Sequence, residues 1–170
     1  MTVAGSPPAP DDVDALVAAW ARERPDLDVT PLLVLSRVTR LARRLDRARA
    51  SAFAGHHLET WEFDVLSALR RAGRPYELSP GQLVAATLVT SGTMTNRIDR
   101  LQARDLVRRR PSRSDRRGVI VALTPSGQTA VDGALIDLLE HERVLLAGLN
   151  PSDQELLAAL LRTLQARLSD

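Results

Sequence analysis

LVTSGTMTNRIDRLQARDLVRRRPSRSDRRGVIVAL, residues 88–123, is the stretch that decides the fold. From Thr93 to about Asp105 its apolar residues recur at helical spacing. After Asp105 the pattern changes to two short apolar strands, Leu106 to Arg110 and Gly118 to Leu123, with turn-forming residues between them. The stretch therefore predicts a helix followed directly by a two-stranded ribbon, the arrangement called a wing.

A shorter helix is expected just before this stretch, from Pro80 to about Leu88. Ser79 provides the capping oxygen, Pro80 fits the first helical position, and Gln82 completes a capping box. Ser91-Gly92 separates this helix from the one that starts at Thr93. Two helices joined by a short glycine-containing turn predict a helix-turn-helix unit.

Positive charge is concentrated in the same region. Between positions 97 and 117 there are nine arginines and three acids, a local excess of +6, whereas the whole chain of 170 residues carries only +2. All 23 basic residues of the chain are arginine. An excess of this size is more than solubility requires, and it predicts a polyanionic partner.

The remaining segments are predicted to be helical, which gives a mainly α fold with a small β-hairpin wing. Start signals and apolar periodicity place the other helices at about Asp11 to Arg24, from Pro31 onward, Glu59 to Arg71, Pro125 to Leu149 and Pro151 to Leu168. Leucine density in the last two exceeds what a small winged domain needs, so we expect a homodimer with a helical dimerisation region.

The predicted elements divide the chain into four parts. A flexible tail (1–10) precedes the amino-terminal helices (11–58), which comprise an extra helix and a dimerisation helix. The winged helix-turn-helix DNA-binding lobe (59–124) is followed by the carboxy-terminal dimerisation helices (125–170).

Composition excludes several classes of protein. The chain has no cysteine, so it has neither disulfides nor thiolate metal sites. No apolar run approaches the roughly 18 residues of a membrane span and no secretory signal is recognisable, so we expect a cytoplasmic protein. No nucleophile elbow, phosphate-binding glycine loop or metal-ligand spacing is present, so we expect neither an enzyme nor a cofactor. His56 and His57 near Glu59 are a weak metal candidate, and we predict no metal site.

The candidate DNA-binding residues lie on the helix from Thr93 and on the wing. On a helical wheel Met94, Ile98 and Leu101 define its buried side, and Asn96 falls nearly opposite. Asn and Arg pair with base edges in the major groove, while Thr hydroxyls suit phosphates. Arginines at the wing tip suit the minor groove. The predicted DNA contacts are Ser91, Thr93, Thr95, Asn96, Arg100, Arg113, Arg116 and Arg117. The alternative is a solvated polar face.

Arg97 differs from its neighbours because the wheel places it about 70° from the buried centre. Its guanidinium could turn inward toward Asp64, which shares a helical stripe with Arg71. A polar pocket and an interhelical salt bridge both fit this pattern. Trp20, on the first amphipathic helix, fits either ordinary core packing or a surface on which a ligand stacks.

The run TSGTMTNRIDRLQARDLVRRRPSRSDRRGVIVALTPSG resembles the MarR family of homodimeric winged helix-turn-helix regulators. Asp115-Arg116-Arg117 is similar to that family's D-x-R wing, and LTPSG to its L-T-x-x-G entry into the dimerisation helix. VAAWARERPDLDVTPLLVLSRVTRLARRLD and WEFDVLSALRR resemble the urate-responsive branch of HucR and PecS type, which has an extra amino-terminal helix.

The resemblance implies a ligand-responsive regulator, a repressor that binds a pseudo-palindromic operator and is released by a small anionic aromatic or purine ligand such as urate. By motif, the ligand site of that branch falls on Trp20, Asp64, Arg71, Arg97 and Arg109. The run Arg108-Arg109-Arg110 departs from the family pattern and leaves open which arginine is linked to the ligand. The alternative function is a constitutive architectural DNA-binding protein without ligand response.

Overall fold

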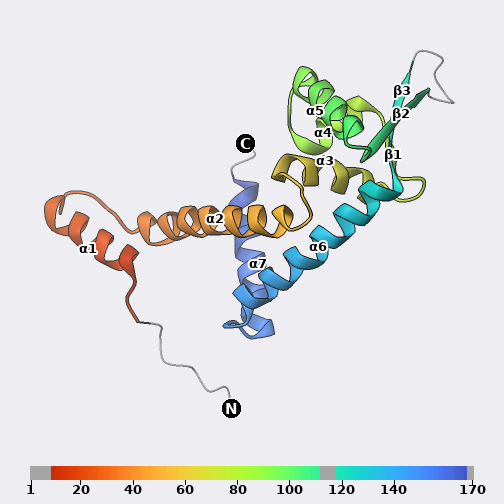
Figure 1. The fold of residues 1–170 in the computed structure, drawn as a ribbon. Helices are drawn as coiled ribbons and strands as arrows, with labels where there is room; N and C mark the ends of the chain where they lie inside the picture. The colour runs from red at the N-terminus through yellow and green to blue at the C-terminus, as the bar shows by residue number, and fades with distance from the viewer. Residues whose placement is uncertain (1–8, 112–117, 168–170) are drawn as a thin grey trace. The chain divides into compact units, whose positions relative to one another are not determined.

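The computed structural model describes residues 9–111 and 118–167 (Figure 1). Seven helices and three strands lie within these residues. In chain order they are α1 (Asp12–Glu23), α2 (Pro31–Ala54), α3 (Thr60–Arg71), β1 (Glu77–Leu78), α4 (Pro80–Thr87), α5 (Ser91–Ala103), β2 (Val107–Pro111), β3 (Val119–Leu123), α6 (Pro125–Leu146) and α7 (Pro151–Ala166). The predicted fold class, mainly helical with a small β wing, is confirmed.

The chain divides into two compact units, Met1–Arg47 and Ala48–Asp170, which we describe separately. In the first unit, Asp11 caps α1 by accepting the Val13 N–H at 2.8 Å, and it also accepts a hydrogen bond from Arg37 of α2 at 2.8 Å. Arg37 lowers the pKa of Asp11 from 3.8 to about 2. Because the pKa is lowered on folding, this pair contributes stability above about pH 4 and loses it as the pH falls toward 2.

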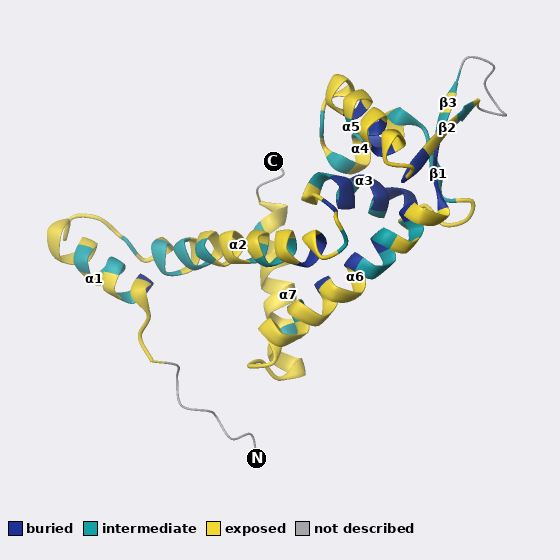
Figure 2. Ribbon diagram, in the orientation of Figure 1, coloured by how far each residue is buried: buried dark blue, intermediate teal, exposed yellow. Residues whose placement is uncertain are grey.

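The core of the second unit is built around α3. Phe63, Leu66 and Leu69 are buried, and the ring of Phe63 stacks on that of Phe53, with centroids 4.1 Å apart. Figure 2 shows buried residues gathered on α3 and exposed residues along α7. An antiparallel sheet of order β1-β3-β2 completes the unit. The two-residue strand β1 was not predicted because it is too short to show an alternating pattern.

The helix-turn-helix unit is formed by α4 and α5. Met94, Ile98 and Leu101 are buried, which confirms the predicted inner side of α5. The helix starts at Ser91, two residues before the predicted Thr93, because Thr90 caps it by accepting the Thr93 N–H at 3.3 Å. The turn before it contains Leu88, whose φ of 54° places it in the left-handed region.

The motif LTPSG joins the wing to α6. The Thr124 hydroxyl lies 2.7 Å and 3.0 Å from the carbonyl oxygens of Asp105 and Leu106, and it accepts the Gly127 N–H at 3.0 Å. A Cβ on Gly127 would lie only 2.1 Å from the Leu106 oxygen. Glycine is therefore required here by the close approach of α6 to the loop after α5.

Apolar side chains remain exposed on the last two helices. None of the described residues of α7 is buried, and α6 has a second apolar set beyond the one that faces the core. The exposed leucines of the two helices include Leu135, Leu139, Leu145, Leu156, Leu157, Leu160 and Leu161. No helix of the described residues is long and apolar enough to cross a membrane.

Gly127→Ala is expected to lower the free energy of unfolding by about 2 kcal/mol, because the new methyl group would overlap the Leu106 backbone. Chemical denaturation at a fixed protein concentration measures this change. Gly148→Ala is the control, since a Cβ at Gly148 meets no atom within 4 Å. Equal stabilities for the two variants would contradict the steric argument.

Candidate nucleic-acid interface and adjoining pocket

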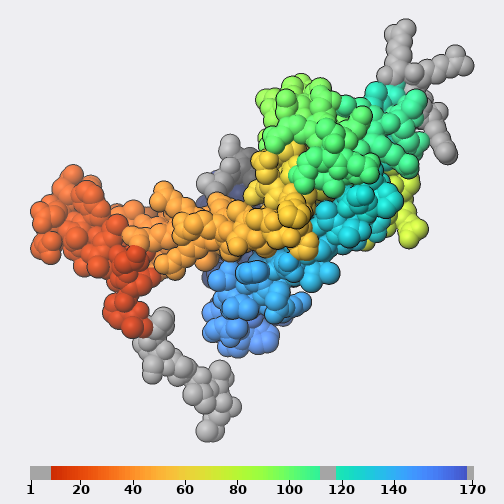
Figure 3. Space-filling view, in the orientation of Figure 1, coloured from red at the N-terminus to blue at the C-terminus, as the bar shows by residue number. Residues whose placement is uncertain are grey.

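The outer face of α5 carries the polar residues predicted to contact DNA. Those within the described part of the chain, Ser91, Thr93, Thr95, Asn96 and Arg100, are all exposed. In the space-filling view the surface of α5 adjoins that of the β2–β3 ribbon (Figure 3). A polar helix face of this kind fits the width of the major groove, where Asn and Arg reach base edges.

An aromatic ring of α3 supports this face. The guanidinium carbons of Arg97 and Arg100 lie 5.5 Å and 4.7 Å from the centroid of the Trp61 ring, within range of cation–π attraction. The indole N–H donates to Glu59 at 2.7 Å, and Arg100 donates to the other oxygen of Glu59 at 2.8 Å. The hydrogen bond from Trp61, followed by the charge of Arg100, lowers the pKa of Glu59, which therefore stays ionised.

A buried carboxylate fixes the other end of α5. Glu62 is 1% exposed, and both of its oxygens accept hydrogen bonds from Nη1 of Arg104, at 2.6 Å and 2.7 Å. Nη2 of Arg104 donates to the carbonyl oxygen of His57 at 2.7 Å. Glu62 also accepts the Glu59 N–H at 2.9 Å. Residues at the amino terminus of α3 thus hold α5 at Arg100 and, one turn later, at Arg104.

Two ion pairs hold the base of the wing. Arg109 of β2 donates to Asp99 of α5 at 2.5 Å, which ties the ribbon to the helix. Arg110, the next residue of β2, pairs with Glu77 of β1 across the sheet, and its Nε donates at 2.8 Å. The wing-tip residues Arg113, Arg116 and Arg117, predicted for the minor groove, lie outside the described residues.

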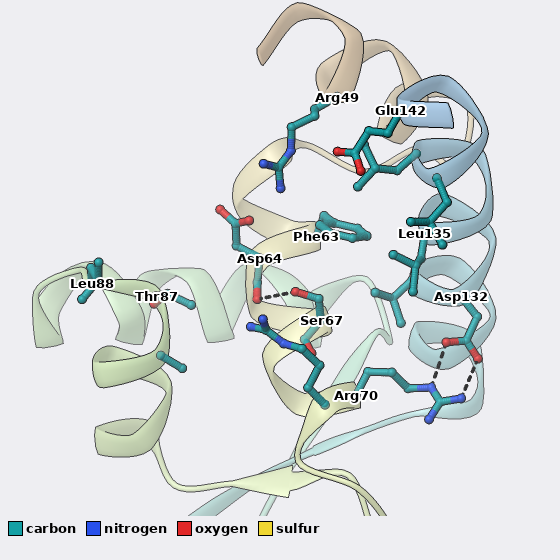
Figure 4. A pocket seen from close by; sticks show the side chains of 15 residues that line it. Arg49, Phe63, Asp64, Ser67, Arg70, Thr87, Leu88, Asp132, Leu135 and Glu142 are labelled. Atoms are coloured by element: carbon teal, nitrogen blue, oxygen red, sulfur yellow. Dashed lines mark hydrogen bonds and ion pairs between the residues drawn. The ribbon is translucent and has the colours of Figure 1, made fainter. Parts of the chain in front are cut away.

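A pocket of about 530 Å³ lies in the second compact unit, beside the end of α4 (Figure 4). It is lined by residues of α3 and α6, the end of α2, and the last turn of α4 with Leu88. Its charged lining residues are Arg49, Asp64, Arg70, Arg71, Asp132 and Glu142. Arg70 and Asp132 pair with each other at 2.8 Å, whereas Arg71, in the part of the chain that the structure describes, donates only to the backbone oxygen of Ser67, at 3.2 Å.

Arg49 gives this pocket an unsatisfied donor. Among the described residues its Nε is buried and has no hydrogen-bond partner. Figure 4 shows Arg49 and Glu142 near one end of the pocket, with Asp64 beside them. Buried donors without partners are rare in folded proteins, and a bound anion would satisfy this one. The volume is within the usual range for small-molecule sites.

The predicted ligand residues are only partly brought together. Asp64 and Arg71 line the pocket described above. Arg97 does not line it, and the prediction that its guanidinium turns toward Asp64 is corrected: it lies over Trp61, in a groove of about 490 Å³ on the outer side of α5. Arg109 pairs with Asp99. Trp20 is half-exposed on α1, in the first unit.

Comparison with known proteins identifies the family. A family model described as the MarR family matches residues 58–118. The HTH-type transcriptional regulator PecS of Dickeya dadantii is 38% identical over 157 residues, which cover 92% of this chain and 95% of PecS. The chain belongs to the MarR family. It is a DNA-binding transcriptional regulator of the PecS type, and not an enzyme.

Solved structures agree with this assignment. The MarR-family chain resembles Bordetella bronchiseptica BpsR, whose DNA binding is regulated by 6-hydroxynicotinic acid, with 31% identity and a TM-score of 0.58 over 76% of this chain and 98% of BpsR. AbsC, a MarR family transcriptional regulator of Streptomyces coelicolor, has 22% identity and a TM-score of 0.74 over 84% of this chain and 97% of AbsC. At that identity the likeness to AbsC supports the fold alone.

Several residues of this MarR-family site were not predicted from the sequence, among them Trp61, Glu59 and Arg49. Trp61 and Glu59 stand just before the buried run of α3, so the sequence already placed them near its start, but no pattern indicated that the ring faces α5. Arg49 belongs to an arginine-rich part of α2, where nothing in the sequence distinguishes it from its exposed neighbours. Only the burial of its Nε singles it out.

Arg104→Ala is expected to lower the free energy of unfolding by about 2 kcal/mol, because it leaves the buried Glu62 carboxylate without its cation. The expected loss is smaller than for a fully buried pair, since the Arg104 side chain is 41% exposed. Arg143→Ala breaks the exposed pair with Glu140 and serves as the control. Urea denaturation compares the two, and an equal loss in both would contradict the importance of Glu62.

Proposed function

We propose that this MarR-family regulator is a homodimeric repressor that binds a pseudo-palindromic operator and is released by a small planar anion such as urate. The observation that carries the proposal is the position of the pocket. Its lining includes Arg49 and Arg71 as well as Thr87 and Leu88 at the turn of the helix-turn-helix unit. A ligand held by the arginines would therefore touch the segment that leads into α5. We expect the regulator to act in the cytoplasm, where an operator is accessible.

The proposed DNA surface combines α5 with the wing. Asn96 and Arg100 would read base edges in the major groove, and Ser91, Thr93 and Thr95 would contact phosphates near the start of α5. The arginines of the wing tip would enter the minor groove beside it. BpsR, a relative whose DNA binding is regulated by a small molecule, supports a regulator of this kind.

The homodimer is proposed from the exposed apolar faces of α6 and α7. A helix with no buried residue among those described, yet rich in leucine, gains stability when a second copy covers it. A two-fold dimer presents two α5 helices that must enter successive major grooves. The matching operator would be a pseudo-palindrome with half-sites about one helical turn apart.

The proposed ligand chemistry follows from the charges of the pocket. Arg49 and Arg71 supply guanidinium groups for an anion, whereas Asp64 and Glu142 disfavour a second negative charge in their vicinity. Leu135 and Leu139 supply apolar surface for a flat ring. Urate fits these features, and so does 6-hydroxynicotinic acid, the molecule that acts on BpsR.

Release of DNA would follow from movement of the turn. Leu88 lines the pocket at the end of α4, and α5 begins three residues later. A ligand that shifts this turn tilts α5 in each lobe, so both lobes lose their match to the grooves together. A preference of about 1–3 kcal/mol for the released state is enough to change operator occupancy substantially.

Selection from a random double-stranded DNA library tests the operator. We expect enrichment of an inverted repeat that binds two chains per site, because the proposed dimer is symmetric. Arg100→Ala should weaken binding to the selected DNA at least tenfold. If no sequence is enriched and binding shows only a steep salt dependence, the protein is instead a constitutive architectural DNA-binding protein.

Release by ligand is tested on the selected DNA with urate and 6-hydroxynicotinic acid. Wild type is expected to dissociate from DNA in the presence of at least one of these anions. Arg71→Ala should bind DNA normally and lose the response, because it removes a guanidinium that would hold the anion. Asp64→Ala should also bind DNA normally and lose the response, because the repulsion between anion and carboxylate that would drive the movement is gone. Arg74→Ala is the matched control, since Arg74 is exposed just beyond α3 and does not line the pocket. Ligand response in both pocket variants equal to that of wild type would contradict the assignment of the pocket.

A further inference from the structure

The amino terminus of α3 carries an arrangement for which the proposed ligand response gives no role. Trp61, Glu59 and Arg100 form a closed set of contacts: the ring lies under the guanidinium, the indole N–H binds the carboxylate, and the carboxylate binds the guanidinium. Each of the three side chains thus contacts the other two. Such mutual contacts restrict Arg100 to a narrow range of positions.

These contacts continue a basic stripe along α5. Arg97, Arg100 and Arg104 are spaced by three and four residues, so they lie on one side of the helix. Arg104 is held by the buried Glu62, Arg100 by the exposed Glu59, and both Arg97 and Arg100 by the face of Trp61. The ion pair that holds each arginine is therefore weaker at Arg100, whose carboxylate partner is exposed, than at Arg104, whose partner is buried.

The position of Arg100 has consequences for binding. Arg100 borders the groove of about 490 Å³ whose lining also includes Thr93 and Asn96, two of the residues proposed to face DNA. The side chains of Arg100 and Glu59 are both more than half exposed, so their ion pair is weak in water and can be exchanged. The cation–π contact does not consume the N–H groups of Arg100, one of which donates to Glu59 and could donate to DNA instead.

We propose that Trp61 is a positioning residue for DNA recognition, which holds Arg100 toward the groove while Glu59 occupies its hydrogen-bonding edge until a DNA phosphate or base replaces the carboxylate. The ring reduces the number of rotamers that Arg100 must give up on binding. The carboxylate has the opposite effect, because it competes with DNA and repels the phosphates. This inference rests on the proposed role of Arg100 in DNA binding.

The test is a double-mutant cycle on the DNA selected by wild type. Trp61→Leu is expected to weaken binding about tenfold in an otherwise wild-type chain, and less than twofold in an Arg100→Ala chain. Trp61→Phe keeps an aromatic face and should restore most of the affinity. Equal losses from Trp61→Leu in both backgrounds would show that Trp61 supports only the fold, and would overturn the proposal.

Glu59→Gln provides a second test that leaves the Trp61 side chain in place. It is expected to strengthen binding about threefold at low salt, and the gain should disappear when Arg100 is replaced by alanine. Glu140→Gln is the matched control, because Glu140 also forms an exposed pair with an arginine but lies on α6. Weaker binding by Glu59→Gln, or no change, would contradict competition between the carboxylate and DNA.

The DNA-binding experiments distinguish the proposed operator from the proposed role of Trp61. If wild type selects no DNA sequence, the proposed operator is wrong. In the other case, wild type binds a selected sequence and Arg100→Ala weakens that binding. If the effects of Trp61→Leu and Glu59→Gln on DNA affinity are then the same with and without Arg100, only the positioning role is wrong.

Discussion

The buried carboxylate of Glu62 is the interaction on which the DNA-binding lobe depends. It accepts a backbone N–H at the start of α3 and pairs with Arg104 near the end of α5, so one side chain fixes two helices relative to each other. A buried charge of this kind is costly unless its partners are in place. The orientation of α5, and with it the direction of its polar face, is therefore set by electrostatics as well as by apolar packing.

Much of this lobe could be predicted from the sequence because its signals are local. Capping residues with proline marked the starts of α4, α6 and α7, and helical spacing identified Met94, Ile98 and Leu101 as buried. The partner of Arg97 could not be predicted in this way. A helical wheel gives the direction of a side chain but not what lies opposite, and in this molecule Trp61 lies there, not Asp64.

The pocket, too, could be predicted only in part from local sequence patterns. Asp64 and Arg71 were placed on one stripe by their spacing of seven, and both line the pocket. Arg49 reaches it from α2 and Glu142 from α6, and such meetings of distant segments depend on packing that no local pattern records. The structure thus separates two sets of arginines. Those of α5 are held by residues of α3, and those of the pocket lie near the turn between α4 and α5.

Leu88 connects these two sets at the end of α4. It is a leucine in the left-handed backbone region, 92% exposed, where helices usually end with glycine. This conformation costs a non-glycine residue roughly 1–2 kcal/mol. The strain of this turn is therefore of the same size as the free-energy difference that the proposed ligand response requires. In the proposed response, relief of this backbone strain would add to the few contacts that a small molecule makes, so that together they could displace α5 from a much larger DNA interface.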